Sequence, residues 1–135
     1  MFESGLYQLI QNDPTLEPLV GQSVWFSQLP KGATFPAIVI HTISDVPDIT
    51  LMETINLRPR RMQIDCISSV DQLDARTFSK AVKKVLQDFA GTLSDGTEVQ
   101  TTILNNDMDI PYEVGARGYA YRVVLDLTFW VVEPG

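Results

Sequence analysis

The apolar residues of this chain change their spacing between residues 61 and 91, from the period of a strand to that of a helix. Over residues 61–68 apolar and polar positions alternate, which is the pattern of a strand with one buried side. Helical spacing follows in Phe78, Ala81, Val82, Val85, Leu86 and Phe89. The two apolar faces can bury each other, so this segment predicts a folded α+β unit.

Both ends of that helix are predicted by local chemistry. Ser69 and Gln72 have the three-residue spacing of a capping box, in which two side chains satisfy backbone N–H groups of the first turn. Gly91 is placed to end the helix, because glycine readily adopts the left-handed conformation found there. We therefore expect the helix to lie between these signals.

Further elements follow from the same pattern. Residues 2–11 have the spacing of a short amphipathic helix, and Asp13 and Pro14 begin a single apolar turn that Gly21 ends. Strands are expected at residues 23–27, 37–44, 98–104 and 119–132. The last strand is the longest, and alternate residues from Tyr121 to Val131 are apolar or aromatic.

The order of these elements predicts an α+β fold. We expect a mostly antiparallel sheet of four to five strands, with the long amphipathic helix and the N-terminal helix packed on one face. The connections are mostly hairpin-like, which favours antiparallel pairing. The chain has 135 residues and no internal repeat, so residues 1–135 are expected to form a single domain.

Two long polar connections separate the strands, at residues 45–59 and 105–118. Connections of this length are often functional, and we expect them to contact other proteins. The alternative is that they are surface loops without a partner. The candidate interface residues are Asp48, Glu53, Asn56, Arg58, Asp107, Asp109, Tyr112, Glu113 and Arg117.

Charge and composition narrow the class of protein. The net charge is −7, from 10 basic and 17 acidic residues, which argues against tight binding to a phosphate backbone. The basic cluster at residues 58–61 is expected to pair with acidic loops. A single cysteine allows no internal disulfide, and no apolar run has the length of a membrane span. We expect a soluble cytoplasmic product.

Catalytic chemistry is not apparent. His41 is the only histidine and lies in an apolar strand, and Cys66 alternates with core residues. Asp65 is expected to bridge to an arginine of a neighbouring strand such as Arg122. We expect no enzyme, no cofactor and no metal site. The alternative is a small ligand-binding or catalytic domain that uses Asp65, Asp126 and His41.

Several segments, taken in order, resemble the tail-completion or tail-terminator proteins of long-tailed phages and prophages. They are an opening helix with an Asp-Pro to Val-Gly turn (residues 6–21), a Pro-x-Gly loop leading into a strand (29–39), a central strand running into a helix (from 61), and a closing strand (121–130). Ala37 departs from the pattern, since an aromatic residue is common there in the family.

The resemblance implies an α+β fold and a structural role in the virion tail. Members form a homohexameric ring on the head-proximal end of the tail tube, stop its polymerisation and join the tail to the head connector. The implied partners are further copies of the chain, the tail tube protein and the connector protein, with no membrane. DNA passes through the lumen without specific binding. The alternative is another head–tail joining protein, either a connector component or a tube subunit.

Overall fold

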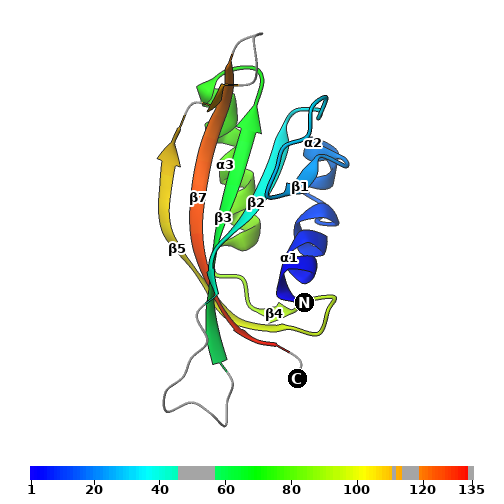
Figure 1. The fold of residues 1–135 in the computed structure, drawn as a ribbon, viewed down its shortest axis with the longest axis vertical. Helices are drawn as coiled ribbons and strands as arrows, with labels where there is room; N and C mark the ends of the chain where they lie inside the picture. The colour runs from blue at the N-terminus through cyan, green and yellow to red at the C-terminus, as the bar shows by residue number, and fades with distance from the viewer. Residues whose placement is uncertain (46–56, 111, 114–118, 134–135) are drawn as a thin grey trace.

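The computed structural model describes residues 1–45, 57–110, 112–113 and 119–133 (Figure 1). The helices are α1 (Phe2–Gln11), α2 (Glu17–Val20) and α3 (Gln72–Leu86). The strands are β1 (Val24–Phe26), β2 (Ala37–Asp45), β3 (Leu57–Ser68), β4 (Gly91–Thr92), β5 (Glu98–Asp109), β6 (Tyr112–Glu113) and β7 (Tyr119–Val132). The helix at residues 2–11 and the strand at residues 119–132 have the predicted bounds.

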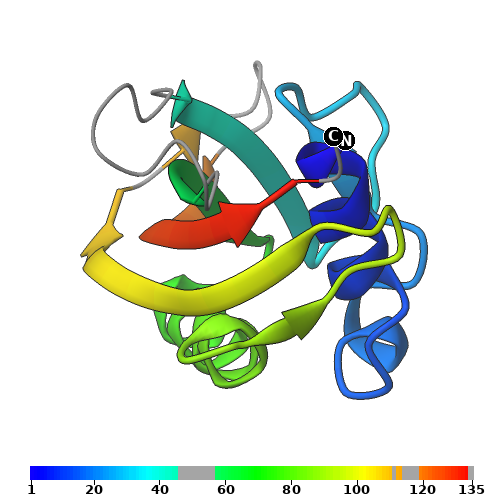
Figure 2. The ribbon, with the colours of Figure 1, turned by 90° about the horizontal axis from the view of Figure 1, so that it is seen from below.

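The strands form one curled sheet (Figure 2). In the described part of the chain they lie in the order β1-β2-β3-β7-β5-β4, and β6 pairs with β7. The central pair, β3 and β7, is in register from Leu57↔Val132 to Ser68↔Tyr121. β1 is parallel to β2, while the other pairs are antiparallel. The α+β class is confirmed, but the sheet is mixed and has more than four to five strands, because β4 and β6 are too short to show a sequence pattern.

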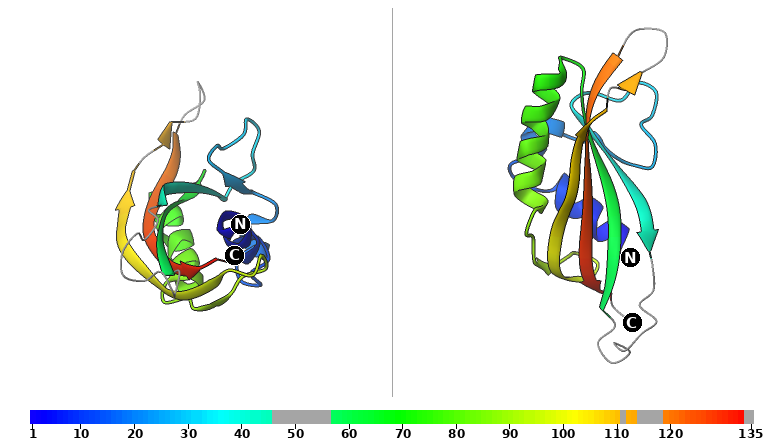
Figure 3. Two further views of the ribbon diagram at one scale, coloured as in Figure 1. Left: turned by 60° about the horizontal axis from the view of Figure 1, so that its bottom comes forward. Right: turned by 90° about the vertical axis from the view of Figure 1, so that its left-hand side faces the viewer.

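Both long helices cover one face of the sheet, with the segment between β1 and β2 on the other (Figure 3). The core contains alternate residues of the two central strands: Met62, Ile64, Cys66, Val123, Leu125, Leu127, Phe129 and Val131. They pack against Phe2, Leu6 and Ile10 of α1 and against Phe78, Val82 and Leu86 of α3. Each fully buried aliphatic or aromatic side chain stabilises the fold by roughly 1.5–3 kcal/mol.

The ends of α3 differ from the prediction. Asp71, not Ser69, is the N-cap, and its Oδ1 accepts a hydrogen bond of 2.7 Å from the backbone N of Asp74. The helix ends at Leu86, and Gly91 lies in β4. An aspartate two residues after the serine caps equally well, and the chain must leave the helix early because Asp88 N donates to Thr102 O of β5.

The strand β5 is longer than predicted. Residues 105–109 continue it, where a connection was expected. Leu104 pairs with Leu127 and Asn106 with Asp126, so Asn105 is an extra residue that forms a bulge. The bulge interrupts the alternation of faces, which is why the sequence pattern stops at Leu104.

The sheet face opposite the helices is called the outer face here. There Leu29 and Phe35, from the segment before β2, pack with Trp25 against Val39 and Ile67. This small second cluster covers only the part of the outer face nearest β1 and β2. Among the described residues, none of the helices combines the length and apolarity needed to cross a bilayer.

Candidate assembly surfaces

Asp65 is the centre of a polar cluster on the outer face. Its side chain is buried, and Gln63 Nε2 donates to its Oδ1 over 2.9 Å. His41 Nε2 lies 3.1 Å from its Oδ2, and Arg122 donates to the same oxygen over 3.3 Å. The predicted bridge between Asp65 and Arg122 is confirmed. With three partners, this carboxylate is occupied in holding three strands together.

Asp126, the other candidate carboxylate, is paired with a different arginine, Arg61. Arg61 Nε donates to Oδ1 over 3.0 Å and its terminal nitrogen donates to Oδ2 over 2.5 Å, while Asn105 donates to Oδ1 over 3.2 Å. The hydrogen bond from Arg61 is the main reason that the pKa of Asp126 lies below its usual range. Because Asp65 and Asp126 have separate partners, they are not a carboxylate pair sharing a proton.

A small recess of about 250 Å³ lies beside His41. It is lined by Ser27, Gln28, Leu29, Val39, His41, Asp65, Ile67 and Arg122. Among the described residues, His41 forms no hydrogen bond to a hydroxyl, and the only cysteine points into the core, where burial raises the pKa of its thiol. The described residues also contain no group of three or more His, Cys, Asp or Glu side chains placed to hold a metal ion. None of the described residues that line the recess is therefore placed as an activated nucleophile.

Asp107 and Asp109 lie on β5, not in a loop, and they face α3. Arg76 pairs with both carboxylates, and Lys83 Nζ lies 2.6 Å from Asp107 Oδ2. Burial opposes ionisation of Asp107, but hydrogen bonds from Lys83 and Arg76 outweigh it and hold its pKa below the usual range. Both predicted interface residues thus fasten β5 to α3 within one chain.

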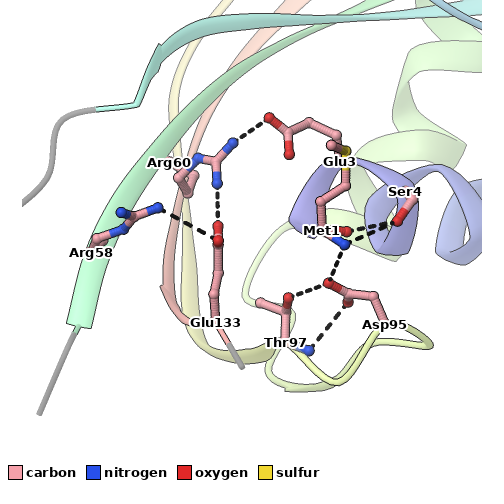
Figure 4. Close-up of polar contacts among 8 residues, drawn as sticks. All are labelled: Met1, Glu3, Ser4, Arg58, Arg60, Asp95, Thr97 and Glu133. Carbon is pink, nitrogen blue, oxygen red and sulfur yellow. Dashed lines mark hydrogen bonds and ion pairs between the residues drawn. The ribbon is translucent and has the colours of Figure 1, made fainter. Parts of the chain in front are cut away.

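Arg58 and Arg60 belong to an ionic cluster where α1, β3 and the end of β7 meet (Figure 4). Arg60 is buried, pairs with Glu3 and Glu133, and lies 5.1 Å from the ring centroid of Phe2. Arg58 lies 3.5 Å from Glu133. The predicted ion pairing of this basic segment is confirmed, but these partners are in α1 and just after β7, not in acidic loops. One signal for Arg60 is present in the amino-acid pattern, because the residue lies on the same side of the alternation as Met62.

The first turn of α1 also packs closely on the turn before β5. Asp95 accepts a 2.6 Å hydrogen bond from Thr97 Oγ1 and lies 3.3 Å from the backbone ammonium of Met1 (Figure 4). A Cβ at Gly5 would lie 2.9 Å from Leu93 Cβ and would also meet the carboxylate of Asp95, so glycine permits this close approach. The helix is thereby held at both the sheet and the turn.

The remaining predicted interface residues are only partly placed. Tyr112 and Glu113 form β6, which pairs with Tyr119 and Ala120 of β7. Asp48, Glu53, Asn56 and Arg117 lie outside the described residues.

The two edges of the sheet are open and unlike. On one edge, β1 pairs only with Ile38–Ile40, and in the described chain no strand covers residues 41–45 of β2. On the other, β4 pairs only with Glu98 and Val99, and none of the described strands covers residues 103–109 of β5.

Both edges carry exposed apolar side chains. The first edge has Phe26 and Ile43, each 41% exposed, and the second has Ile103 at 48% and Met108 at 40%. Open edges with apolar residues are surfaces for strand addition. Sequence periodicity had not singled out these four residues, because it identifies apolar positions without saying which are left exposed.

Comparisons with known proteins identify a family and a solved structure of similar fold. The model of the family "Tail completion protein gp17" matches residues 4–132. A chain of a solved structure described as "Virion of native gene transfer agent (GTA) particle" has a similar fold, with a TM-score of 0.67 at 18% sequence identity, over 96% of this chain and 92% of that one. Among curated proteins, no sequence matches.

Proposed function

Because the chain belongs to the tail completion protein gp17 family, we propose that this phage tail structural protein is a tail terminator. In this proposal identical chains form a six-membered ring on the head-proximal end of the tail tube. The ring stops tube polymerisation and joins the tail to the head connector. No catalytic step is included, which is supported by the full set of partners around Asp65 and Asp126.

The proposal rests on the two open and unlike edges of the sheet. A contact between opposite edges of two copies is heterologous, and it repeats until the rotation closes a ring. β2 is antiparallel to β3, β3 to β7, and β7 to β5, so β5 and β2 run in opposite directions. Rotation about an axis along the strands preserves these directions. The β5 edge of one copy therefore meets the β2 edge of the next as an antiparallel pair.

The chemistry of the two edges supports such a contact. Backbone groups of residues 103–109 and 41–45 supply the hydrogen bonds, while Phe26, Ile43, Ile103 and Met108 supply apolar area. A stable interface buries about 1,600 Å² in total, so neighbouring surfaces must also contribute. The edges set direction and register, and the surrounding surface adds stability.

Passage of DNA through such a ring is supported by the charge pairing on the outer face. Arg61 is paired with Asp126, and Arg122 with Asp65. DNA retention requires cations that neutralise phosphates, and these two are already neutralised within the chain. Arg58 and Arg60 are likewise paired with Glu133, so the described arginines of the basic segment form no cationic strip.

The test compares the wild-type chain with an edge variant, Ile103→Lys/Met108→Lys, and a control, Leu19→Lys, whose exposed leucine (45%) lies on the helix α2 and not on an edge strand. By light scattering, the wild type and the control are expected to have a mass six times the 15.1 kDa of one chain. The edge variant is expected to have the mass of a single chain. Added to polymerising tube protein, wild type and control should shorten the tubes, and the edge variant should not.

Other outcomes identify other functions. A wild-type monomer that leaves tube length unchanged would refute the terminator. A chain that stacks into long tubes by itself would be a tube subunit, and one that binds the connector without halting tube growth would be a connector component. An edge variant that retains the ring mass would show that the copies meet elsewhere.

A further inference from the structure

A hydrogen bond at the end of β5 shows which backbone groups of this strand point to the open edge. Ile110 N donates to Arg122 O of β7 over 3.0 Å. In an antiparallel pair, successive residues direct their backbone groups alternately towards the partner strand and away from it. The backbone groups of Met108 therefore also point to β7, whereas those of Asp107 and Asp109 point to the open edge.

On the β2 edge the same reasoning identifies Thr42. Ile38 N donates to Ser23 O over 2.9 Å, so its backbone groups point to the β1 side. Ile40 O accepts from Ser27 N over 2.8 Å and points the same way. The pairing of β2 with β3 is regular up to Thr42, so the backbone groups of Thr42 also point to this side. Because β1 pairs only as far as Ile40, none of the described strands covers them.

The two outward residues of β5 are not equally available. Asn106 Oδ1 accepts a 2.8 Å hydrogen bond from Asp107 N, so a side chain of the same strand already occupies this donor. Among the described residues, no strand lies against the outward backbone groups of Asp109. An incoming strand can therefore form both backbone hydrogen bonds at Asp109 without displacing a side chain.

The end of β1 excludes the same position independently. If Thr42 of one copy paired with Asp107 of the next, antiparallel counting would place Asp109 opposite Ile40. The outward carbonyl of Ile40 is already bonded to Ser27 N. Pairing of Thr42 with Asp109 avoids this conflict, because the added strand then begins where β1 ends.

We propose that Thr42 of one copy and Asp109 of the next exchange the two backbone hydrogen bonds that set the register of the ring contact. This inference rests on the proposed function, in which the β2 edge meets the β5 edge as an antiparallel pair. Each of the two residues supplies one N–H donor and one C=O acceptor. Asn106 acts as a register-setting residue, because its side chain blocks the alternative position.

The side chains agree with this register. Asp107 and Asp109 pair with α3, so Met108 between them lies on the outer face. His41 contacts Asp65 on the outer face, and alternation places Ile43 there too. The register brings Ile43 of one copy beside Met108 of the next, so two apolar side chains that are 41% and 40% exposed cover each other.

The experiment places two cysteines in the full chain. Ile43 and Met108 flank the proposed hydrogen-bonded pair, where facing Cα atoms are about 4.5 Å apart, which suits a disulfide. The reporter is therefore Ile43→Cys/Met108→Cys. The control is His41→Cys/Met108→Cys, whose cysteines would face each other only in the register excluded above and otherwise lie diagonally, about 7–8 Å apart. Cys66 is buried and stays in both variants.

Ring mass is measured by light scattering under reducing conditions, and linked chains by electrophoresis without reductant after mild oxidation. We expect the reporter to give linked products of up to six chains and the control to give roughly a tenth as much. β2 and β5 are separate edges of one sheet, so each link must join two copies (Figure 1). An equal mixture of the single variants Ile43→Cys and Met108→Cys should give linked pairs, and neither alone should give any.

The readouts separate this inference from the proposed function. The mass of the wild type tests the ring, and the ratio of linking between reporter and control tests the register. A wild-type ring in which the control links as well as the reporter, or in which the mixed single variants stay unlinked, would overturn the register and leave the ring standing. A wild type without the ring mass would overturn both.

Discussion

Arg60 places a positive charge in the layer between the sheet and α1. Its side chain is 3% exposed, and Glu3 from α1 and Glu133 after β7 neutralise it from two directions. A buried charge without a partner costs several kcal/mol, so the two carboxylates are needed wherever this arginine is kept. The residue therefore links the first turn of α1 to the end of the central strand pair.

Replacing Arg60 with methionine is expected to lower the free energy of unfolding by about 3 kcal/mol. The change removes the cation and leaves Glu3 and Glu133 facing each other across the site. Arg61→Met is the matched control, because that side chain is 49% exposed and solvent screens its pair with Asp126, so the loss of stability should be smaller. Urea unfolding followed by circular dichroism measures both. Equal losses in the two variants would contradict the role of Arg60.

At the scale of elements, the half of β5 beyond its bulge is held to α3 by charge. Arg76 and Lys83 on the helix meet Asp107 and Asp109 on the strand, 24 to 33 residues away in sequence. Leu104, just before the bulge, packs partly against the core, and residues 106–109 beyond it do not belong to the core cluster. The ion pairs therefore substitute for apolar packing at the open edge, which makes the edge sensitive to pH.

The pKa of Asp107 lies below its usual range in the folded chain. The ionised carboxylate therefore stabilises the fold fully at a pH above its pKa in the unfolded chain, about 3.9, and this stabilisation is lost as the pH falls through its pKa in the folded chain. We expect Asp107→Asn to cost about 2 kcal/mol near neutral pH, and the variant and wild type to converge in acid. Urea unfolding at a series of pH values measures this. Asp109→Asn removes the other carboxylate partner of Arg76, which is 51% exposed, and should lower the free energy of unfolding by less than Asp107→Asn does. A cost independent of pH would contradict the assignment.

The elements that could be predicted from the sequence are those with strong apolar periodicity. The bounds of α1 and β7 agree with the prediction because both have an uninterrupted apolar stripe. The half of β5 beyond Leu104 was missed, since a bulge breaks its alternation and its acidic residues pair with cations on a distant helix. The parallel pairing of β1 was also missed, because its three residues carry no signal for direction.

The candidate contact surfaces were predicted less well than the fold. Polarity and length pointed to residues 105–109 as a contact loop, although their acidic side chains are engaged with α3. The exposed apolar residues of the two edges were not identified, because exposure depends on which neighbours the folded chain provides. A pattern along the sequence records only that a position is apolar.

At the scale of the whole molecule, the outer face should bind duplex DNA only after its charge pairing is broken. The wild type, with a net charge of −7, is expected to show no binding at physiological salt. Asp126→Asn leaves Arg61 without its carboxylate and should produce weak binding at low salt, with a logarithmic salt slope of about 0.9 per phosphate contacted. Fluorescence anisotropy with labelled DNA measures both. The double variant Asp126→Asn/Arg61→Gln should return to wild-type behaviour, and strong binding by the wild type would contradict the prediction.

Inserted residues in the edge strands bear on the width of the channel in the proposed ring. A contact between unlike edges has no built-in limit on the number of chains, so the angle between successive sheets decides when the circle is complete. That angle depends on the curvature of each sheet, to which the extra residues Ile43 in β2 and Asn105 in β5 contribute. Deleting either one should flatten the strand and admit more chains per turn. The diameter available to a passing polymer would then be adjusted by single-residue insertions and deletions, with the core left intact.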